Sequence, residues 1–327
     1  MKAEYVTRAR LKPAEIVVWV VIVAVLALVP QYAALWTEIL ILALFAISLD
    51  LILGYGGIVS LGHAAFFGFG AYAAGLYAIH VSPEPLTGLV VATAGAALLG
   101  ALTSFIVLRG SDLTRLMVTL AVASILYELA NRFSGLTGGA DGLPGIFIDP
   151  LFGRFEFDLE GVTGSWYTFV VFFLLFMLAR RIVHSPFGVG LEAIRDNRLR
   201  AQSIGIAVNA RLAAVYTLAA AYAGAAGALL VQTTGFASLD VLSFHRSADV
   251  LLALVLGGTG YLYGGILGAI VFKIMHDFLS SLTPHYWQFW MGFALVAIML
   301  IGRDRIYDTV RDLLARMRPG QGKGGQA

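Results

Sequence analysis

The chain has 327 residues, of which 59% are hydrophobic and only 13% are charged. This charged share is about half that of an average soluble domain, so no aqueous globular fold accounts for the sequence, and lipid must solvate much of its surface. The sequence contains no cysteine, which excludes disulfides and thiolate metal sites, and its formal net charge of +2 says little because the placement of the charges carries the information.

Long apolar segments recur along the whole chain and predict an all-α, polytopic membrane protein. A spanning helix needs roughly 20 mostly apolar residues. The segment 248–280 is too long for one crossing and is interrupted by Gly257–Gly265, so we expect two legs that flank a turn. Counting both legs gives about ten crossings, with about eight crossings and a re-entrant hairpin as the alternative. The apolar segments are 15–30, 34–53, 62–81, 87–108, 115–134, 166–182, 211–231, 248–280 and 286–302.

Basic residues predict the orientation, because cytoplasmic loops of membrane proteins carry an excess of Lys and Arg. With the N-terminus in the cytoplasm, 18 basic residues fall on cytoplasmic segments, three fall on outer segments, and Lys273 lies within a span. We therefore expect both termini in the cytoplasm. The expected organisation is a cytoplasmic segment 1–14, a transmembrane domain 15–302 and a cytoplasmic tail 303–327.

The segment Gly54–Gly62 predicts a second helix break, and a stripe of small residues follows it. Small residues at every third position of residues 62–71 let membrane helices approach closely. Tight helix packing is one interpretation, and a broken helix beside a translocation path is the other. Polar groups inside spans are costly and face protein, water or a partner. The residues that we assign to a translocation path, with structural pairing as the alternative, are Asp50, Ser60, His63, Glu128 and Asn131.

The predicted outer loop 135–165 is long for a connection, and such loops are often functional. Its first part is rich in glycine and favours compact turns. We expect either a docking surface for an external partner or a structured linker. The loop residues assigned to this role are Thr137, Gly138, Gly139, Asp141 and Gly142.

The predicted cytoplasmic stretch 183–210 has the pattern of a short amphipathic helix, which Pro186 can begin and Gly205 can end. A short helix along the membrane, with apolar side chains among charges, is suited to insert into a groove on a soluble partner. The alternative is a helix that lies on lipid headgroups. The expected face comprises Leu191, Ile194, Arg195 and Arg198, and Ala201 and Ile204 continue its apolar stripe.

Sequence motifs for catalysis are absent. No Gly-x-x-x-x-Gly-Lys-Ser/Thr phosphate-binding loop and no His-Glu-x-x-His motif occurs, and the six histidines show no ligand spacing. We therefore expect no enzymatic activity, no metal site and no bound cofactor in this chain.

Taken together, these segments resemble the M-type permease subunit of bacterial ABC importers for branched-chain amino acids. One departure is Asp50, where members of this family commonly have asparagine. The matching stretches occur in the family's order and cover most of residues 40–302. They are Leu53–Tyr72, Val118–Leu143, Ser185–Ile206, Ala223–Leu229 and Asp249–Gly268.

The resemblance implies a set of partners in the bacterial inner membrane. These are a second homologous permease, two cytoplasmic ATPase subunits that use ATP and Mg, and an outer solute-binding protein; no nucleic acid is implied. It also implies that ATPase coupling falls in the region 185–206. The residues that it assigns to coupling are Gly190, Leu191, Glu192, Ala193, Ile194, Arg195, Asp196, Asn197 and Gly205.

The expected function is import of leucine, isoleucine and valine, driven by ATP hydrolysis in the partner subunits. One alternative is an ABC importer permease for a different substrate, namely urea, short amides, other amino acids or ribose-type sugars. Another is an ion-coupled secondary transporter, which needs acidic groups at mid-membrane; Asp50, Glu128 and Asp249 are the candidates.

Overall fold

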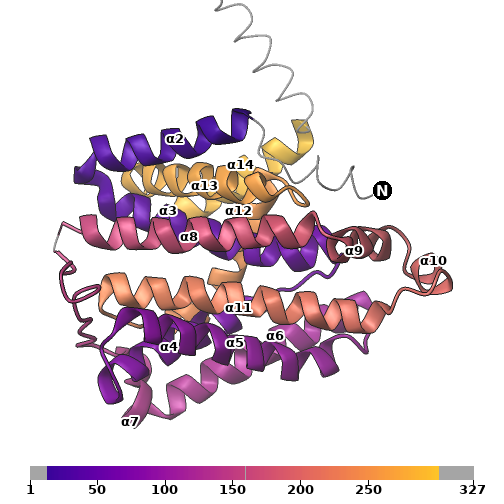
Figure 1. Ribbon diagram of the computed structural model, residues 1–327, viewed down its shortest axis with the longest axis horizontal. Coiled ribbons are helices and arrows are strands. Elements are labelled where there is room, and N and C mark those ends of the chain that lie inside the picture. Colours follow the sequence, from indigo (N-terminus) through magenta and orange to yellow (C-terminus); the bar gives the residue numbers. More distant parts are fainter. Residues whose placement is uncertain (1–12, 159, 302–327) are drawn as a thin grey trace, which may run out of the picture. The chain divides into compact units, whose positions relative to one another are not determined.

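The computed structural model describes residues 13–158 and 160–301 (Figure 1). The expected cytoplasmic tail 303–327 and most of the expected N-terminal segment 1–14 therefore lie outside the described residues. The chain divides into two compact units, Met1–Phe272 and Lys273–Ala327.

Helices make up the regular structure of the described ranges, as the sequence predicts. Two isolated bridges, Leu143–Ala237 and Leu151–Phe155, are the β-type pairings among these residues. The α-helices are α2 (Pro13–Leu28), α3 (Ala33–Asp50), α4 (Ala64–His80), α5 (Pro85–Val107), α6 (Asp112–Arg132), α7 (Ser134–Thr137), α8 (Val162–Val183), α9 (Pro186–Asp196), α10 (Arg198–Ser203), α11 (Val208–Thr234), α12 (Phe244–Gly257), α13 (Leu262–Leu282) and α14 (Trp287–Ile301).

Within the described residues, six helical segments are long and apolar enough to cross a membrane. The shorter helices α2, α4, α12 and α14 complete the ten expected segments. Helix α12 is about 21 Å long at 1.5 Å per residue, which falls short of a hydrocarbon core of about 30 Å. The six long segments are Pro30–Tyr55, Pro85–Val107, Asp112–Arg132, Val162–Val183, Val208–Thr234 and Leu262–Leu282.

Helix α11 is the centre of the first unit and packs against α3, α4 and α5 (Figure 1). Small residues make the approach close: a Cβ on Gly70 would meet the backbone of Gly224, and a Cβ on Gly227 would meet the carbonyl of Phe67. Gly68, in the stripe of small residues, packs as closely, because a Cβ there would meet the Leu242 side chain. The stripe therefore takes part in tight helix packing, as the first of its two interpretations expects.

The outer faces of α2 and α5 are apolar and exposed. Val17 and Val20 on α2, and Leu98, Leu102 and Phe105 on α5, are all more than half exposed. Such surfaces suit lipid, because hydrocarbon solvates them at no cost.

Both predicted breaks are present. The first follows α3 as a π-helical turn, Leu51–Tyr55, and Gly57 then turns the chain with a φ of 67° that favours glycine. The second lies between α12 and α13, where Gly258 and Gly260 have φ values of 106° and 77°. The long segment 248–280 is therefore two helices joined by a turn, as predicted.

The first unit has two ends that differ in what they carry. Helices α9 and α10 lie at one end, which we call the α9 end, and α7 lies at the other, the α7 end (Figure 1). Hydrogen bonds of Asp50 and Arg195 join both breaks to one another and to α9, so both breaks lie at the α9 end.

In the described part of the second unit, α13 ends and α14 follows after a short turn. The side chains of Lys273 and Asp277 form an ion pair at 2.9 Å, and the His276 and Trp287 rings meet edge to face with centroids 4.5 Å apart. The ring contact ties α13 to the start of α14.

Candidate functional site

The region 185–206 folds as two short helices, α9 and α10, rather than one. The Ser185 hydroxyl accepts from the Phe187 N–H at 3.2 Å and caps α9, which Pro186 begins. Asn197 has an extended backbone, and its side-chain oxygen accepts from the Arg200 N–H at 2.9 Å to cap α10. Asn197 thus ends one helix and starts the next.

The apolar face of α9 is buried within the chain. Leu191 and Ile194 are only 1% and 4% exposed, because α9 packs against the ends of α8 and α11. The expectation that these two side chains project towards a partner, in one stripe with Ala201 and Ile204, is therefore wrong. The apolar side chains that do project are Ile204, which is 70% exposed, and Leu199, which is 77% exposed.

Arg211 of α11 holds α9 in place. Its Nη1 donates to the backbone carbonyls of Pro186 and Phe187 at 3.0 and 3.2 Å, and its guanidinium carbon lies 6.0 Å from the centre of the Phe187 ring. A Cβ on Gly190 would occupy the position of this guanidinium. Glycine at 190 therefore leaves room for the Arg211 guanidinium between α9 and α11.

Arg195 joins α9 to the first break. Its Nη1 donates to the backbone carbonyl of Gly54, and its side-chain stem lies where a Cβ on Gly57 would come within 3.0 Å of it. The carbonyl of Gly54 belongs to the π-helical turn, where regular helical pairing is interrupted. A side chain of α9 thus satisfies a backbone group of the break.

Asp50 joins the first break to the second. Its Oδ1 accepts a 2.7 Å hydrogen bond from the backbone N–H of Gly260, and the residue is fully buried. The Arg195 guanidinium acts electrostatically on this carboxyl group and lies next to Gly260. We call Asp50, Gly54, Arg195 and Gly260 the Arg195 cluster; it links α9, the end of α3 and the α12–α13 turn.

The other residues assigned to coupling vary in exposure. Glu192 and Ala193 are half-buried, while Asp196 and Asn197 are exposed. The Arg195 side chain is 41% exposed, with its Nε 3.6 Å from Asp196 Oδ1. Gly205 has a φ of 88° and follows the end of α10.

The five residues assigned to a translocation path do not converge. Asp50 belongs to the Arg195 cluster. His63 is buried, with its Nε2 2.8 Å from Ser48 Oγ, and Ser60 is buried as well. Glu128 and Asn131 are exposed on α6.

Glu128 lies in a hollow on the outer face of α6. This hollow is open and has a volume of about 490 Å³. A carboxylate on the exposed face of a spanning helix needs water or a partner protein beside it. The residues that line this hollow are Leu120, Ala123, Ser124, Tyr127, Glu128, Leu242, Ser243 and Phe244.

The assigned loop residues form compact turns at the α7 end. Gly138, Gly139 and Gly142 all have positive φ, and the Thr137 hydroxyl donates to the Phe133 carbonyl at 3.0 Å. Asp141 is exposed. After these turns, Leu143 pairs with Ala237 and so ties the loop to the chain that follows α11.

Sequence patterns did not identify Gly260, Arg211 or Leu199 as parts of this site. Gly260 was recognised only as part of a break, and Arg211 only as a basic residue. The glycine at 190, which stands opposite Arg211, is the one local signal of that contact. In the described ranges, no group of three His, Asp or Glu side chains is arranged to hold a metal ion.

Spanning helices, two glycine-based breaks joined through Asp50, and a short helix tied to the first break by Arg195 define a polytopic membrane protein. The family described as "Branched-chain amino acid transport system / permease component" matches residues 31–301. The chain belongs to this family.

Named relatives are similar over most of their length. The LivM permeases of Salmonella typhimurium and Escherichia coli, described as high-affinity branched-chain amino acid transport system permease proteins, are each 29% identical to the chain. Each alignment covers 89% of the chain and 73% of the relative. The LivH permease of Salmonella typhimurium is 24% identical over 79% of the chain and 88% of the relative. No solved structure matches the chain.

Proposed function

We propose that the chain is a permease subunit of an ABC importer that moves leucine, isoleucine and valine into the cytoplasm. The LivM and LivH relatives are named as branched-chain amino acid permeases, and both types match this one chain. Two related permeases favour a paired assembly, in which a homologous second permease stands beside this one. ATP hydrolysis then takes place in two further subunits, and a solute-binding protein delivers the cargo.

The single observation that carries the coupling assignment is the Arg195 cluster. Arg195 of α9 is hydrogen-bonded to the first helix break, and Asp50 at the end of α3 in turn binds the second break. A partner that pushes α9 and α10 therefore moves the ends of α3 and of α12 as well. Rearrangement of packed helices by such a push is a known form of conformational switching.

The α9 end faces the cytoplasm in this proposal. Loops on that side of a membrane carry the excess of Lys and Arg. Support comes from the described arginines, of which only Arg132, Arg154 and Arg246 lie at the α7 end. The eight at the α9 end are Arg109, Arg115, Arg180, Arg181, Arg195, Arg198, Arg200 and Arg211. The solute-binding protein then docks at the α7 end, on the loop that begins with Thr137.

Reconstituted transport tests the function directly. The full-length chain is placed in liposomes with a homologous second permease, two ATPase subunits and the solute-binding protein. We expect uptake of radiolabelled leucine that requires internal ATP and is inhibited by isoleucine and valine. Inhibition by urea or ribose instead would change the cargo, and uptake without the ATPase subunits would refute the ABC assignment.

The ATPase contact is tested at the two apolar side chains that project from the α9 end. Burying a leucine or isoleucine at an interface contributes about 1.5–3 kcal/mol, so Leu199→Asp with Ile204→Asp should weaken ATPase binding at least about tenfold. The control is Phe147→Asp, which changes an 82% exposed side chain at the α7 end. Binding of the ATPase subunits is measured by co-purification from detergent extracts.

The control should bind the ATPase subunits as the unmodified chain does. If the Leu199 and Ile204 double variant also binds them normally and supports ATP-driven uptake, α10 does not contact the ATPases. In that case its exposed apolar side chains are left to contact lipid headgroups.

A further inference from the structure

At the α9 end, a groove lies between the ends of α5 and α11, away from the Arg195 cluster. It has a volume of about 440 Å³ and opens to the surface. Both polar and apolar side chains line it, so a ligand that fills it needs a polar and an apolar part. The lining residues are Ser104, Phe105, Leu108, Arg109, Arg198, Asn209, Ala210 and Ala213.

Two arginines give the groove a positive charge that no carboxylate of the described residues neutralises. Arg198 donates to the side-chain oxygen of Asn209 at 2.7 Å, a neutral partner. Among residues 13–158 and 160–301, no carboxylate pairs with Arg109 or Arg198. By contrast, the neighbouring Arg115 has its own carboxylate, Asp112, at 2.8 Å. The groove therefore presents cationic donors to an outside anion.

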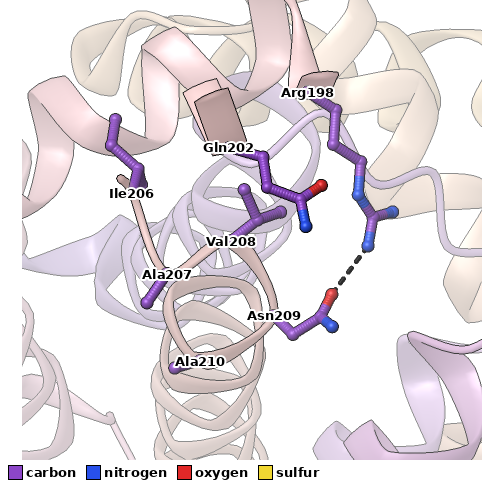
Figure 2. A pocket seen from close by; sticks show the side chains of 7 residues that line it. All are labelled: Arg198, Gln202, Ile206, Ala207, Val208, Asn209 and Ala210. Carbon is purple, nitrogen blue, oxygen red and sulfur yellow. Dashed lines mark hydrogen bonds between the residues drawn. The ribbon is translucent and has the colours of Figure 1, made fainter. Parts of the chain in front are cut away.

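Polar side chains converge beside Arg198. Figure 2 shows the Gln202 and Asn209 amides pointing into the same space as the Arg198 guanidinium. This space is a second hollow of about 290 Å³, and it shares Arg198, Asn209 and Ala210 with the groove. Guanidinium and amide N–H groups are donors that suit the oxygens of a phosphate group.

An apolar stripe leads from the groove along α5. Leu98, Leu102 and Phe105 are 63%, 59% and 67% exposed, and their spacing of four and three residues places them on one face of the helix. Arg109 follows four residues later, just beyond the end of α5. The stripe belongs to a segment that is long and apolar enough to span a membrane, so its exposed side chains suit contact with acyl chains.

We propose that this groove binds a membrane phospholipid with an anionic headgroup. The phosphate lies between Arg109 and Arg198, with Asn209 and Gln202 as further donors, and an acyl chain follows Phe105, Leu102 and Leu98. Basic pockets at the ends of spanning helices favour anionic headgroups in general. A soluble anion would use the arginines but not the stripe, and an ATPase subunit would not reach along a spanning helix. The proposal does not depend on the cargo.

Lipid retention by the purified full-length chain tests the site. The chain in mild detergent is titrated with phosphatidylglycerol or with phosphatidylcholine, and bound lipid is counted by native mass spectrometry. Each Lys or Arg near an anionic lipid changes its affinity by about fivefold, so Arg109→Gln with Arg198→Gln should weaken phosphatidylglycerol binding about 25-fold. Phosphatidylcholine binding should change little.

A matched control removes two other exposed arginines. Arg154→Gln with Arg200→Gln lowers the net charge equally, and neither residue lines the groove. This control should retain phosphatidylglycerol as the unmodified chain does. A single variant, Asn209→Asp, keeps the shape of an exposed side chain and supplies Arg198 with a carboxylate, so it should weaken headgroup binding without disturbing the fold.

Four results would overturn the proposal. Unchanged phosphatidylglycerol binding in both the Arg109 and Arg198 double variant and the Asn209→Asp variant would exclude the groove. An equal loss of phosphatidylglycerol binding in the Arg154 and Arg200 control would mean that the net charge of the chain, and not the groove, attracts the lipid. Complete displacement by millimolar inorganic phosphate or glycerol 1-phosphate would assign the site to a soluble anion. Loss of ATPase binding with unchanged lipid retention would assign it to a protein partner.

Discussion

Replacing Asp50 with alanine should detach the α12–α13 turn from the first helix break. The Asp50 carboxyl group is the described acceptor for the Gly260 N–H, and alanine removes it without adding bulk. The Arg195 bond to Gly54 does not involve the Asp50 side chain, so α9 should stay attached to the first break. The change therefore separates one half of the Arg195 cluster from the other.

The size of the effect follows from the burial of the two groups. A buried donor left without an acceptor costs about 1–3 kcal/mol. Asp50 is fully buried, but Gly260 is half-buried, so water can reach part of the N–H and the lower part of this range applies. At 1.4 kcal/mol per factor of ten, the opened form of the turn should become about 5- to 20-fold more populated.

Cysteine labelling can measure this population, because the chain has no cysteine of its own. Leu262→Cys places a thiol at the start of α13, where the side chain is only 4% exposed. A soluble maleimide reacts with it only when the turn opens, so the labelling rate should rise about 5- to 20-fold in the Asp50→Ala background. A second reporter, Ala237→Cys, is buried at the α7 end and should label at one rate in both backgrounds.

The matched control is Asp50→Asn. Its amide oxygen accepts from the Gly260 N–H in the same geometry, so labelling of Leu262→Cys should match that of the parent. If alanine also leaves the rate unchanged, the Asp50–Gly260 bond does not hold the turn. If asparagine raises the rate as much as alanine, the charge of Asp50 and not the hydrogen bond is what matters.

Two further predictions concern close packing. Gly68→Leu should force the new side chain into Leu242 and lower the stability of the purified chain by about 1–3 kcal/mol. The measurement is the unfolding temperature in detergent, which should fall. The control Gly135→Leu should leave this temperature unchanged, because no atom lies within 4 Å of a Cβ at that position. Gly190→Ala should displace the Arg211 guanidinium and weaken ATPase binding. Adding Arg211→Ala to this variant should restore part of the ATPase binding. If the losses of binding in the two single variants simply add up in the double variant, the contact between Gly190 and Arg211 is refuted.

The spans and breaks were predictable because the bilayer constrains them strongly. Apolar length reveals a crossing, and glycine clusters reveal where a helix stops. The boundaries of α5 and α13 lie within a few residues of expectation. The division of 248–280 into two helices follows from the glycines between Gly257 and Gly265, which sequence alone makes visible.

The contacts of the site were less predictable, for two physical reasons. An amphipathic helix shows which of its faces is apolar, but not whether that face meets the chain itself or a partner; Leu191 and Ile194 meet the chain itself. The partners of Arg195 and Asp50 are backbone groups, the carbonyl of Gly54 and the N–H of Gly260, and backbone groups carry no signal of residue type.

The use of backbone groups also explains why this arrangement suits a moving part. A break leaves carbonyl and N–H groups without helical partners, and at membrane depth each must find one inside the protein. Here the partners are side chains of other elements, so moving α9 or the α12–α13 turn exposes those groups unless a new partner replaces the old one. The α7 end differs, since Gln232 binds both Tyr167 and the Pro85 carbonyl and thereby joins three spanning helices directly. A push on α9 should therefore separate the helix ends at the α9 end first. At the α7 end the bonds of Gln232 should keep the spanning helices together.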